Sequence, residues 1–296
     1  MNRKTFIKMG LAGTTGIFAL NELEGLSKLL PNTEQLAPAF FVGHGSPMNA
    51  IEENKFSKKW QTLLTKIEKP NLILMISAHW FTRGTFITGQ VKPRTIYDFG
   101  GFPDELYRVV YEAPGSPEMA KKISEMIDNP EIKIDYEWGF DHGNWSIMKH
   151  INPKADIPVI QLSIDYREPA SFHYELGKKL KELRKKGVVI IGSGNLVHNL
   201  RLVNWHKNPE EDFGYDWAIE MNQFHVENIK QRNIQPLVDW KLKGQAAQLA
   251  IPSLDHYAPM LYIAGVMDKK DDIEIFNNSL LMGSLSMTSF SLIPKS

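Results

Sequence analysis

Short apolar runs alternate along the chain with longer segments whose apolar residues follow a helical spacing. The apolar runs predict strands at residues 39–42, 72–77, 158–164, 188–192 and 287–293. The helically spaced segments predict helices at residues 55–67, 117–127, 168–186, 216–231 and about 256–266. Most of the runs are apolar throughout, as in parallel strands buried on both faces, whereas residues 287–293 alternate as an edge strand does. This order predicts an α/β sheet fold, and because no linker or repeat divides it we expect one domain.

Residues that start or stop helices support these boundaries. Ser116 followed by Pro117 is typical of a helix start, and Gly187 is typical of a residue that ends one. Two remaining segments, 85–113 and 138–145, are rich in aromatic residues and glycine. We expect both to be loops that form the wall of a pocket.

Three of the apolar runs lead into a histidine. His44 lies between Gly43 and Gly45 directly after the first run, His79 follows the second, and His198 follows the run at 188–192. Flanking glycines let the backbone turn sharply, so that an imidazole projects into open space. The carboxyl ends of the strands are the edge where open α/β sheets bind ligands, so we expect these histidines to meet there.

Composition limits the chemistry that such a site can perform. The formal charge is zero at neutral pH, so nothing indicates a nucleic-acid partner or an anionic membrane surface. The sequence has no cysteine, which excludes disulfides, thiolate metal sites and cysteine nucleophiles. A metal in this protein must therefore be held by nitrogen and oxygen atoms.

Five of the nine histidines lie among glycine, serine, asparagine or aspartate at strand ends or in loops: His44, His79, His142, His198 and His256. The other four lie in helical or polar stretches, and we interpret them as surface or core residues: His150, His173, His206 and His225. Clustered neutral imidazoles suit Zn²⁺, Fe²⁺, Cu²⁺ or Ni²⁺ rather than Mg²⁺ or Ca²⁺. Nearby polar side chains that we expect to orient the imidazoles are Asp141, Asn195, Asn199 and Asp255.

Other catalytic patterns are weak in this sequence. Gly192-Ser193-Gly194 is not a nucleophile elbow, and the paired glycines around His44 lack the third glycine of a dinucleotide fingerprint. The residues alone leave three functions open: a redox metalloenzyme, a zinc-dependent hydrolase that activates water, and a non-catalytic metal-binding protein.

Residues 1–36 form an N-terminal extension. A basic start, Arg3-Lys4, precedes a mildly apolar stretch, an order similar to a twin-arginine export signal with lysine in the second place. The apolar stretch is too short for a transmembrane helix. The alternatives are a periplasmic protein with a functional signal and a cytoplasmic protein with an amphipathic N-terminal segment.

Six motifs occur in one order along the chain: Gly43-His44-Gly45-Ser46-Pro47, Ser77-Ala78-His79-Trp80, Tyr97-Asp98-Phe99-Gly100-Gly101-Phe102-Pro103, Gly139-Phe140-Asp141-His142-Gly143, Gly192-Ser193-Gly194-Asn195-Leu196-Val197-His198 and Asp255-His256-Tyr257. Together they resemble the DOPA-type extradiol ring-cleaving dioxygenases of the class III extradiol superfamily. The resemblance spans about residues 39–293. It implies a single-domain three-layer α/β/α sandwich around a mostly parallel mixed sheet, with residues 37–296 as the catalytic domain.

The same resemblance implies a function and a site. Catecholic substrates such as DOPA would be opened beside the diol with O₂ to give a semialdehyde. One divalent metal per chain is implied, Fe²⁺ as the active ion or Zn²⁺ as the ion found on isolation. Its ligands would be His44, His79 and His256, with His198 either a fourth ligand or the acid/base, and His142 catalytic in the substrate pocket. Candidates for aromatic pocket walls are Trp80, Tyr97, Phe99, Trp138 and Trp145, and for at least half of them we expect core packing instead.

Overall fold

The computed structural model describes residues 30, 32–33, 35–209 and 211–295. The predicted export signal therefore lies outside the described residues. Among those that are described, no helix is long and apolar enough to cross a membrane.

The centre of the molecule is a mixed β-sheet. In the described part of the chain it has eight strands in the order β4-β3-β5-β2-β6-β1-β10-β7. The strands are β1 (Ala39–Gly43), β2 (Leu72–Thr82), β3 (Thr85–Thr88), β4 (Ile132–Asp135), β5 (Val159–Asp165), β6 (Val188–Gly194), β7 (Asp271–Phe276) and β10 (Ser289–Pro294). Four neighbouring strands, β5, β2, β6 and β1, run parallel, and β10 joins β1 in antiparallel orientation. The predicted mostly parallel mixed sheet is confirmed.

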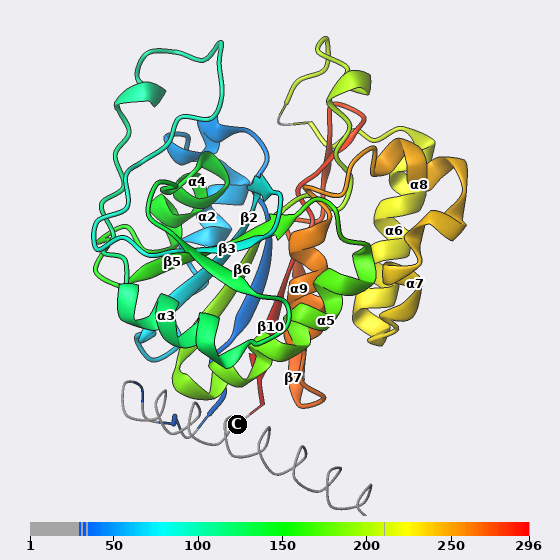
Figure 1. Cartoon of the computed structure of the whole chain (residues 1–296). Helices are drawn as coiled ribbons and strands as arrows, with labels where there is room; N and C mark the ends of the chain where they lie inside the picture. Colours follow the sequence, from blue (N-terminus) through cyan, green and yellow to red (C-terminus); the bar gives the residue numbers. More distant parts are fainter. Residues whose placement is uncertain (1–29, 31, 34, 210, 296) are drawn as a thin grey trace, which may run out of the picture.

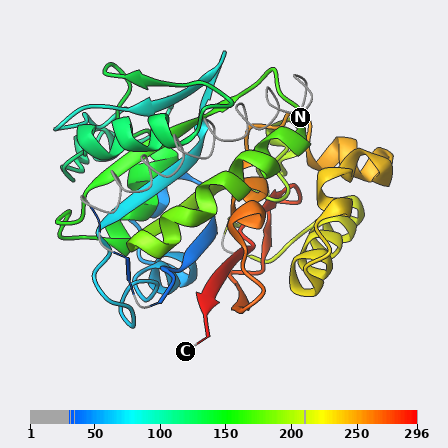
Figure 2. The same ribbon diagram turned by 60° about the horizontal axis from the view of Figure 1, so that its bottom comes forward.

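Helices cover both faces of this sheet (Figure 1). They are α2 (Lys55–Trp60), α3 (Pro117–Met126), α4 (His142–Ile151), α5 (Ala170–Leu180), α6 (Asp216–Gln231), α7 (Gln235–Val238), α8 (Gln245–Ala250) and α9 (Ala258–Val266). Helices α2 and α4 pack on one face, and α3, α5 and α9 pack on the other, where α6, α7 and α8 extend the layer sideways. Figure 2 shows the second layer from another side, with α5 crossing in front of the sheet.

Successive side chains of the central strands point to opposite faces of the sheet, and this produces two cores. On β1, Ala39 and Phe41 belong to the core beneath α5 and α9, whereas Phe40 and Val42 belong to the core beneath α2 and α4. All four side chains are at most 1% exposed. A strand that buries both faces must be apolar at every position, which accounts for the continuous apolar runs in the sequence. The predicted three-layer sandwich is confirmed.

Several predicted elements differ from those in the structure. The predicted edge strand 287–293 is an interior strand, β10, because β7 pairs along its outer side. Helix α2 ends at Trp60 rather than at residue 67, and turns follow it. The region 85–113 begins with a strand, β3, which pairs with β4 at the other end of the sheet. Both of these strands were missed because they are only four residues long and partly exposed.

A second, small sheet lies beside the main one. Strands β8 (Leu280–Leu281) and β9 (Leu285–Ser286) form a hairpin, and an isolated bridge joins Leu285 to His198. The hairpin thereby fastens the segment that follows β6.

Candidate metal centre and substrate pocket

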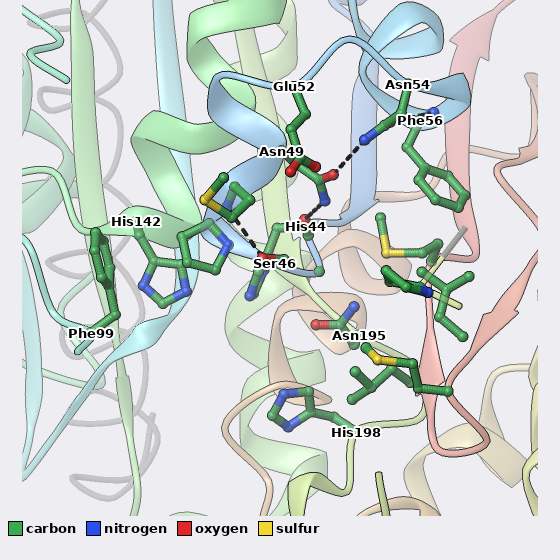
Figure 3. A pocket seen from close by; sticks show the side chains of 18 of the residues that line it. His44, Ser46, Asn49, Glu52, Asn54, Phe56, Phe99, His142, Asn195 and His198 are labelled. Atoms are coloured by element: carbon green, nitrogen blue, oxygen red, sulfur yellow. Dashed lines mark hydrogen bonds between the residues drawn. The ribbon is translucent and has the colours of Figure 1, made fainter. Parts of the chain in front are cut away.

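A deep pocket opens at the carboxyl ends of β1, β2 and β6, the edge where the sequence predicted a site. Its volume is about 1240 Å³. All five predicted site histidines line it: His44, His79, His142, His198 and His256. Figure 3 shows His142 beside Phe99 on one side of the pocket, and Asn195 and His198 on another.

The sharp turn after β1 places His44 in the pocket. Gly45 has a φ of +62°, in the left-handed region that favours glycine. A side chain on Gly43 would lie 2.7 Å from the backbone of Met287, so only glycine lets these segments approach so closely. The Asn49 side-chain amide donates to the carbonyl oxygen of His44 at 2.9 Å and fixes the turn. The imidazole is therefore held in one place by the backbone around it.

His79 lies within β2, not beyond its end as the sequence predicted. The pairing of β2 with β5 shifts between Ile76 and Phe81, where β2 carries more residues than its partner. Such an irregularity bends a strand and redirects its side chains, and it turns His79 into the pocket. Gly143 packs against the ring, since a side chain there would lie 2.8 Å from Cδ2 of His79.

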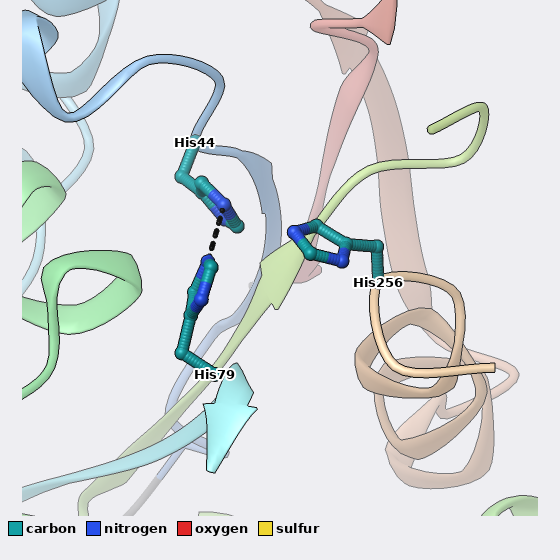
Figure 4. A group of neighbouring side chains, drawn as sticks. All are labelled: His44, His79 and His256. Atoms are coloured by element: carbon teal, nitrogen blue, oxygen red, sulfur yellow. Dashed lines mark hydrogen bonds between the residues drawn. The ribbon is translucent and has the colours of Figure 1, made fainter. Parts of the chain in front are cut away.

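The Nε2 atoms of His44 and His79 face each other at 3.1 Å (Figure 4). Ser193 donates its hydroxyl proton to the carbonyl of Gly143 at 2.5 Å, so its oxygen accepts from Nδ1 of His44 at 3.0 Å. Nδ1 of His79 lies 3.2 Å from the carboxylate of Asp98, which only accepts. These contacts place a proton on Nδ1 of each ring, so that the two Nε2 lone pairs face each other. Two lone pairs at this distance repel unless one cation binds both.

His256 supplies a third nitrogen. It directly precedes the first turn of α9, and its carbonyl approaches so near that a side chain on Gly194 would lie 2.2 Å from it. Its Nδ1 lies 3.2 Å from the carboxylate of Asp255, which leaves Nε2 for a ligand. Ligand atoms of His44, His79 and His256 all lie within 4.8 Å of one another, and Figure 4 shows the three rings converging from separate elements. Three imidazoles fit one transition-metal or zinc ion, and an oxygen atom lies 3.0 to 3.2 Å from the outer nitrogen of each.

The sequence predicted His142 in a loop, but in the structure it is the first residue of helix α4. Asp141 caps the helix by accepting from the backbone N–H of Asn144 at 3.1 Å. Asp98 accepts from the backbone N–H of His142 at 2.8 Å and from its Nδ1 at 2.9 Å. The ring of Phe99 meets that of His142 edge to face, with centroids 5.6 Å apart.

His198 lies flat against His256. Their rings are parallel within 5° and their centroids are 3.5 Å apart. Nitrogen lone pairs lie in the plane of the ring, so two stacked rings direct them along parallel planes rather than to a common point. This arrangement favours a role for His198 as a neighbouring acid or base over that of a ligand shared with His256.

Burial keeps four of the site histidines neutral: His44, His142, His198 and His256. Desolvation, followed by the charges of neighbouring histidines, lowers the pKa of His44 and of His198. Desolvation also lowers the pKa of His142 and His256, partly opposed by Asp98 and Asp255 respectively. Burial alone would raise the pKa of Asp98, but hydrogen bonds from His142 and His79 outweigh it and lower that pKa. At neutral pH His44 and His256 therefore present neutral imidazoles, the protonation state that metal ligation requires.

The four histidines interpreted as surface or core residues lie elsewhere. His173 and His225 are fully buried in the core, His150 bonds to the carbonyl of Asn49, and His206 is exposed. Of the predicted orienting residues, Asp255 contacts His256, and Asn195 donates its backbone N–H to the carbonyl of that residue at 2.9 Å.

The other two predicted orienting residues, Asp141 and Asn199, act as helix caps. Sequence reasoning missed Asp98 and Ser193, which bond to outer imidazole nitrogens. Both belong to glycine-containing motifs of the sequence, but only the fold brings them to the rings.

The aromatic candidates for the pocket wall agree with the expectation that at least half of them serve packing. Of the five, Phe99 lines the pocket. Trp80 and Trp138 stack on each other with centroids 5.8 Å apart, and Trp145 is fully buried. Tyr97 donates to the carbonyl of Val109. Packing rather than ligand contact thus accounts for these four, while Phe56, Phe102 and Trp205 line the pocket in their place.

Comparisons with known proteins agree with this geometry. The family model described as the catalytic LigB subunit of aromatic ring-opening dioxygenase matches residues 38–289. A 4,5-DOPA dioxygenase extradiol from Escherichia coli K12 is 44% identical over 85% of this chain and 93% of its own length. One from Beta vulgaris is 34% identical over 87% and 97%. The crystal structure of an uncharacterized protein from Escherichia coli K12 superposes with a TM-score of 0.75 at 40% identity, covering 86% of this chain and 99% of that one.

The resemblance to the class III extradiol dioxygenases is thereby confirmed, and a dioxygenase is favoured over a zinc hydrolase or a non-catalytic metal-binding protein. The chain belongs to the LigB family of aromatic ring-opening dioxygenases.

Proposed function

We propose that the protein cleaves catechols that carry a polar side chain, such as DOPA, beside the diol and with O₂, giving a semialdehyde. The observation that carries this proposal is the facing pair of bare nitrogens on His44 and His79, at the base of a pocket large enough for a substituted aromatic ring. Relatives named 4,5-DOPA dioxygenase extradiol support the choice of substrate.

His44, His79 and His256 are the proposed metal ligands. A bound Fe²⁺ would supply a Lewis acid for the catechol oxygens and a redox centre between substrate and O₂. Fe²⁺ is the proposed active ion, because Zn²⁺ has no redox chemistry, although the same three imidazoles would also hold Zn²⁺. Three protein ligands would leave room at the metal for substrate.

His142 is the proposed base for a catechol proton. Its Nδ1–H is directed to Asp98, so Nε2 is the nitrogen that can accept a proton. Burial lowers its pKa, which keeps it neutral and able to accept at neutral pH. His198, stacked on His256, is the proposed second acid/base, placed to hold or return a proton as the ring opens. Phe99 and Phe102 cover this side of the pocket and reduce the access of water.

The outer part of the pocket supports a substrate with a charged side chain. Its volume of about 1240 Å³ is larger than a catechol ring requires. The lining includes Glu52, Lys55 and Lys207, so charges of both signs are available to an ammonium and a carboxylate group. A zwitterionic catechol such as DOPA has this chemistry.

Oxygen uptake tests the proposal. Metal-stripped protein is reconstituted anaerobically with Fe²⁺ and mixed with aerated L-DOPA, and O₂ consumption is followed with the absorbance of the product. We expect stoichiometric uptake and a yellow ring-opened product with Fe²⁺, and none with Zn²⁺. A His206→Ala variant, which changes an exposed histidine, is the matched control and should behave as the unaltered protein does. Equal turnover with Zn²⁺ and Fe²⁺, or no uptake with any catechol, would contradict the proposal.

A further inference from the structure

One carboxylate, that of Asp98, contacts two of the site histidines at once. Its Oδ2 atom lies 2.9 Å from Nδ1 of His142 and 3.2 Å from Nδ1 of His79. Its Oδ1 atom accepts from the backbone N–H of His142 at 2.8 Å. The two rings are neighbours, with centroids 3.7 Å apart. Asp98 therefore lies between a proposed metal ligand and the proposed base.

We infer that Asp98 is a positioning residue that holds His79 and His142 in the same tautomer, so that one residue prepares both the metal site and the proton acceptor. This inference rests on the proposed function for the role of each ring. A carboxylate accepts and never donates when ionised, so it selects the form of both rings that has the proton on Nδ1. Nε2 of His79 is then bare for a metal, and Nε2 of His142 is bare for a proton.

A second interpretation of the same contacts is that Asp98 is itself a metal ligand, because His79, Asp98 and His142 also have ligand atoms within 4.8 Å of one another. The hydrogen bonds weigh against it. Both oxygens of Asp98 already accept protons from His142, and a metal at Nδ1 of His79 would leave the facing nitrogens of His44 and His79 without a cation. The two interpretations predict different results for the same variant.

Asp98→Asn is the sharpest perturbation, because the amide keeps the shape of the carboxylate. The backbone N–H of His142 still needs an acceptor, which fixes the amide oxygen in the place of Oδ1. The NH₂ group then replaces Oδ2 and faces both Nδ1 atoms as a donor. Both rings are then stable with the proton on Nε2, so a metal binds His79 only at the cost of restoring the other tautomer, and His142 has no free lone pair on Nε2 to accept a proton.

The experiment combines two measurements on the full chain. Histidine ¹⁵N NMR of the metal-free protein at neutral pH reports which nitrogen of each ring is protonated. Competition with a chromophoric chelator reports the affinity for Zn²⁺, used as the probe metal. Asp104→Asn, an exposed aspartate in the same loop, is the matched control and should leave both unchanged.

We expect His79 and His142 to be protonated on Nδ1 in the unaltered protein and on Nε2 in Asp98→Asn. Zn²⁺ affinity should fall by about ten- to a hundredfold, the effect typical of losing an outer partner of a ligand, with one ion still bound per chain. Complete loss of Zn²⁺ binding would identify Asp98 as a ligand and overturn the inference, as would unchanged tautomers in a folded variant. If the variant fails to fold, the NMR measurement on the unaltered protein still tests the inference. Protonation of either ring on Nε2 in that protein would overturn the inference.

The two measurements distinguish failure of the positioning role from failure of the proposed function. If no catechol supports O₂ uptake but the tautomers and the Zn²⁺ affinity change as expected, the positioning role stands and the substrate assignment falls. If the unaltered protein turns over L-DOPA while Asp98→Asn keeps its tautomers and metal affinity, the positioning role falls alone.

Discussion

Replacing His142 by alanine separates proton transfer from metal binding. In the structure Asp98 accepts hydrogen bonds from the backbone N–H and from Nδ1 of His142, and Nδ1 of His79 lies 3.2 Å from its carboxylate. The substitution removes one of them and leaves the contact with His79 in place. Since the metal ligands keep their outer partners, metal affinity should change by less than about tenfold.

Turnover should respond far more strongly. Loss of a positioned general base typically lowers the rate by about 10²- to 10⁴-fold, which corresponds to about 3–5 kcal/mol of transition-state free energy. The assay measures kcat and KM for L-DOPA from initial O₂ uptake by the Fe²⁺-loaded variant, alongside its Fe²⁺ content and that of His206→Ala. We expect the loss to appear in kcat. The reasoning is refuted if His142→Ala keeps both metal and full kcat, or if it loses the metal altogether.

Three further predictions concern the metal, the substrate side chain and the fold. His79→Ala should abolish metal binding and O₂ uptake, because it removes one of the two facing nitrogens; full metal content by elemental analysis would contradict the assignment. Lys207→Gln should raise KM for L-DOPA a few-fold, the size expected of a partly exposed ion pair, and leave KM for catechol unchanged; equal changes for both substrates would exclude a contact with the side chain. Asp271→Ala should lower the free energy of unfolding by about 3–5 kcal/mol in urea titrations, because it leaves the fully buried Arg184 guanidinium without its carboxylate; a change below about 1 kcal/mol would contradict this.

Much of the fold could be predicted from the sequence because its strands are buried on both faces. Runs such as 188–192 are apolar at every position, a pattern that few other structures require. Helix α6 was predicted with the boundaries that the structure has, and Gly187 ends the η3 turn (Lys181–Lys186) in the left-handed conformation, with a φ of +69°. Local pattern and local structure agree in these segments.

Position in the sheet could not be predicted in the same way. Whether β10 lies at an edge depends on β7, a strand with exposed positions that carries no apolar run. The orientation of His79 depends on how β2 pairs with β5, a contact between segments about eighty residues apart. Pairing partners are chosen by the whole fold, so the sequence of one strand does not reveal them.

The histidines of the site were found from their neighbours, whereas their hydrogen-bond partners were not. Glycine on both sides of His44 is a local signal, and so is the aspartate next to His256. Asp98, by contrast, is 44 residues from His142 in the chain, and Ser193 is 149 from His44. A residue whose partner ring is far away in the sequence produces no characteristic motif spacing, so only the folded structure identifies it.

The fate of isotopically labelled O₂ is the most direct test of ring cleavage by this protein. The Fe²⁺-loaded protein is mixed with L-DOPA and ¹⁸O₂, and the product is analysed by mass spectrometry and NMR before its aldehyde oxygen exchanges with water. We expect both labelled atoms to enter one product, whose ring is cut beside the diol rather than between its hydroxyl groups. A quinone formed without incorporation of label, or a ring cut between the two hydroxyl-bearing carbons, would contradict it.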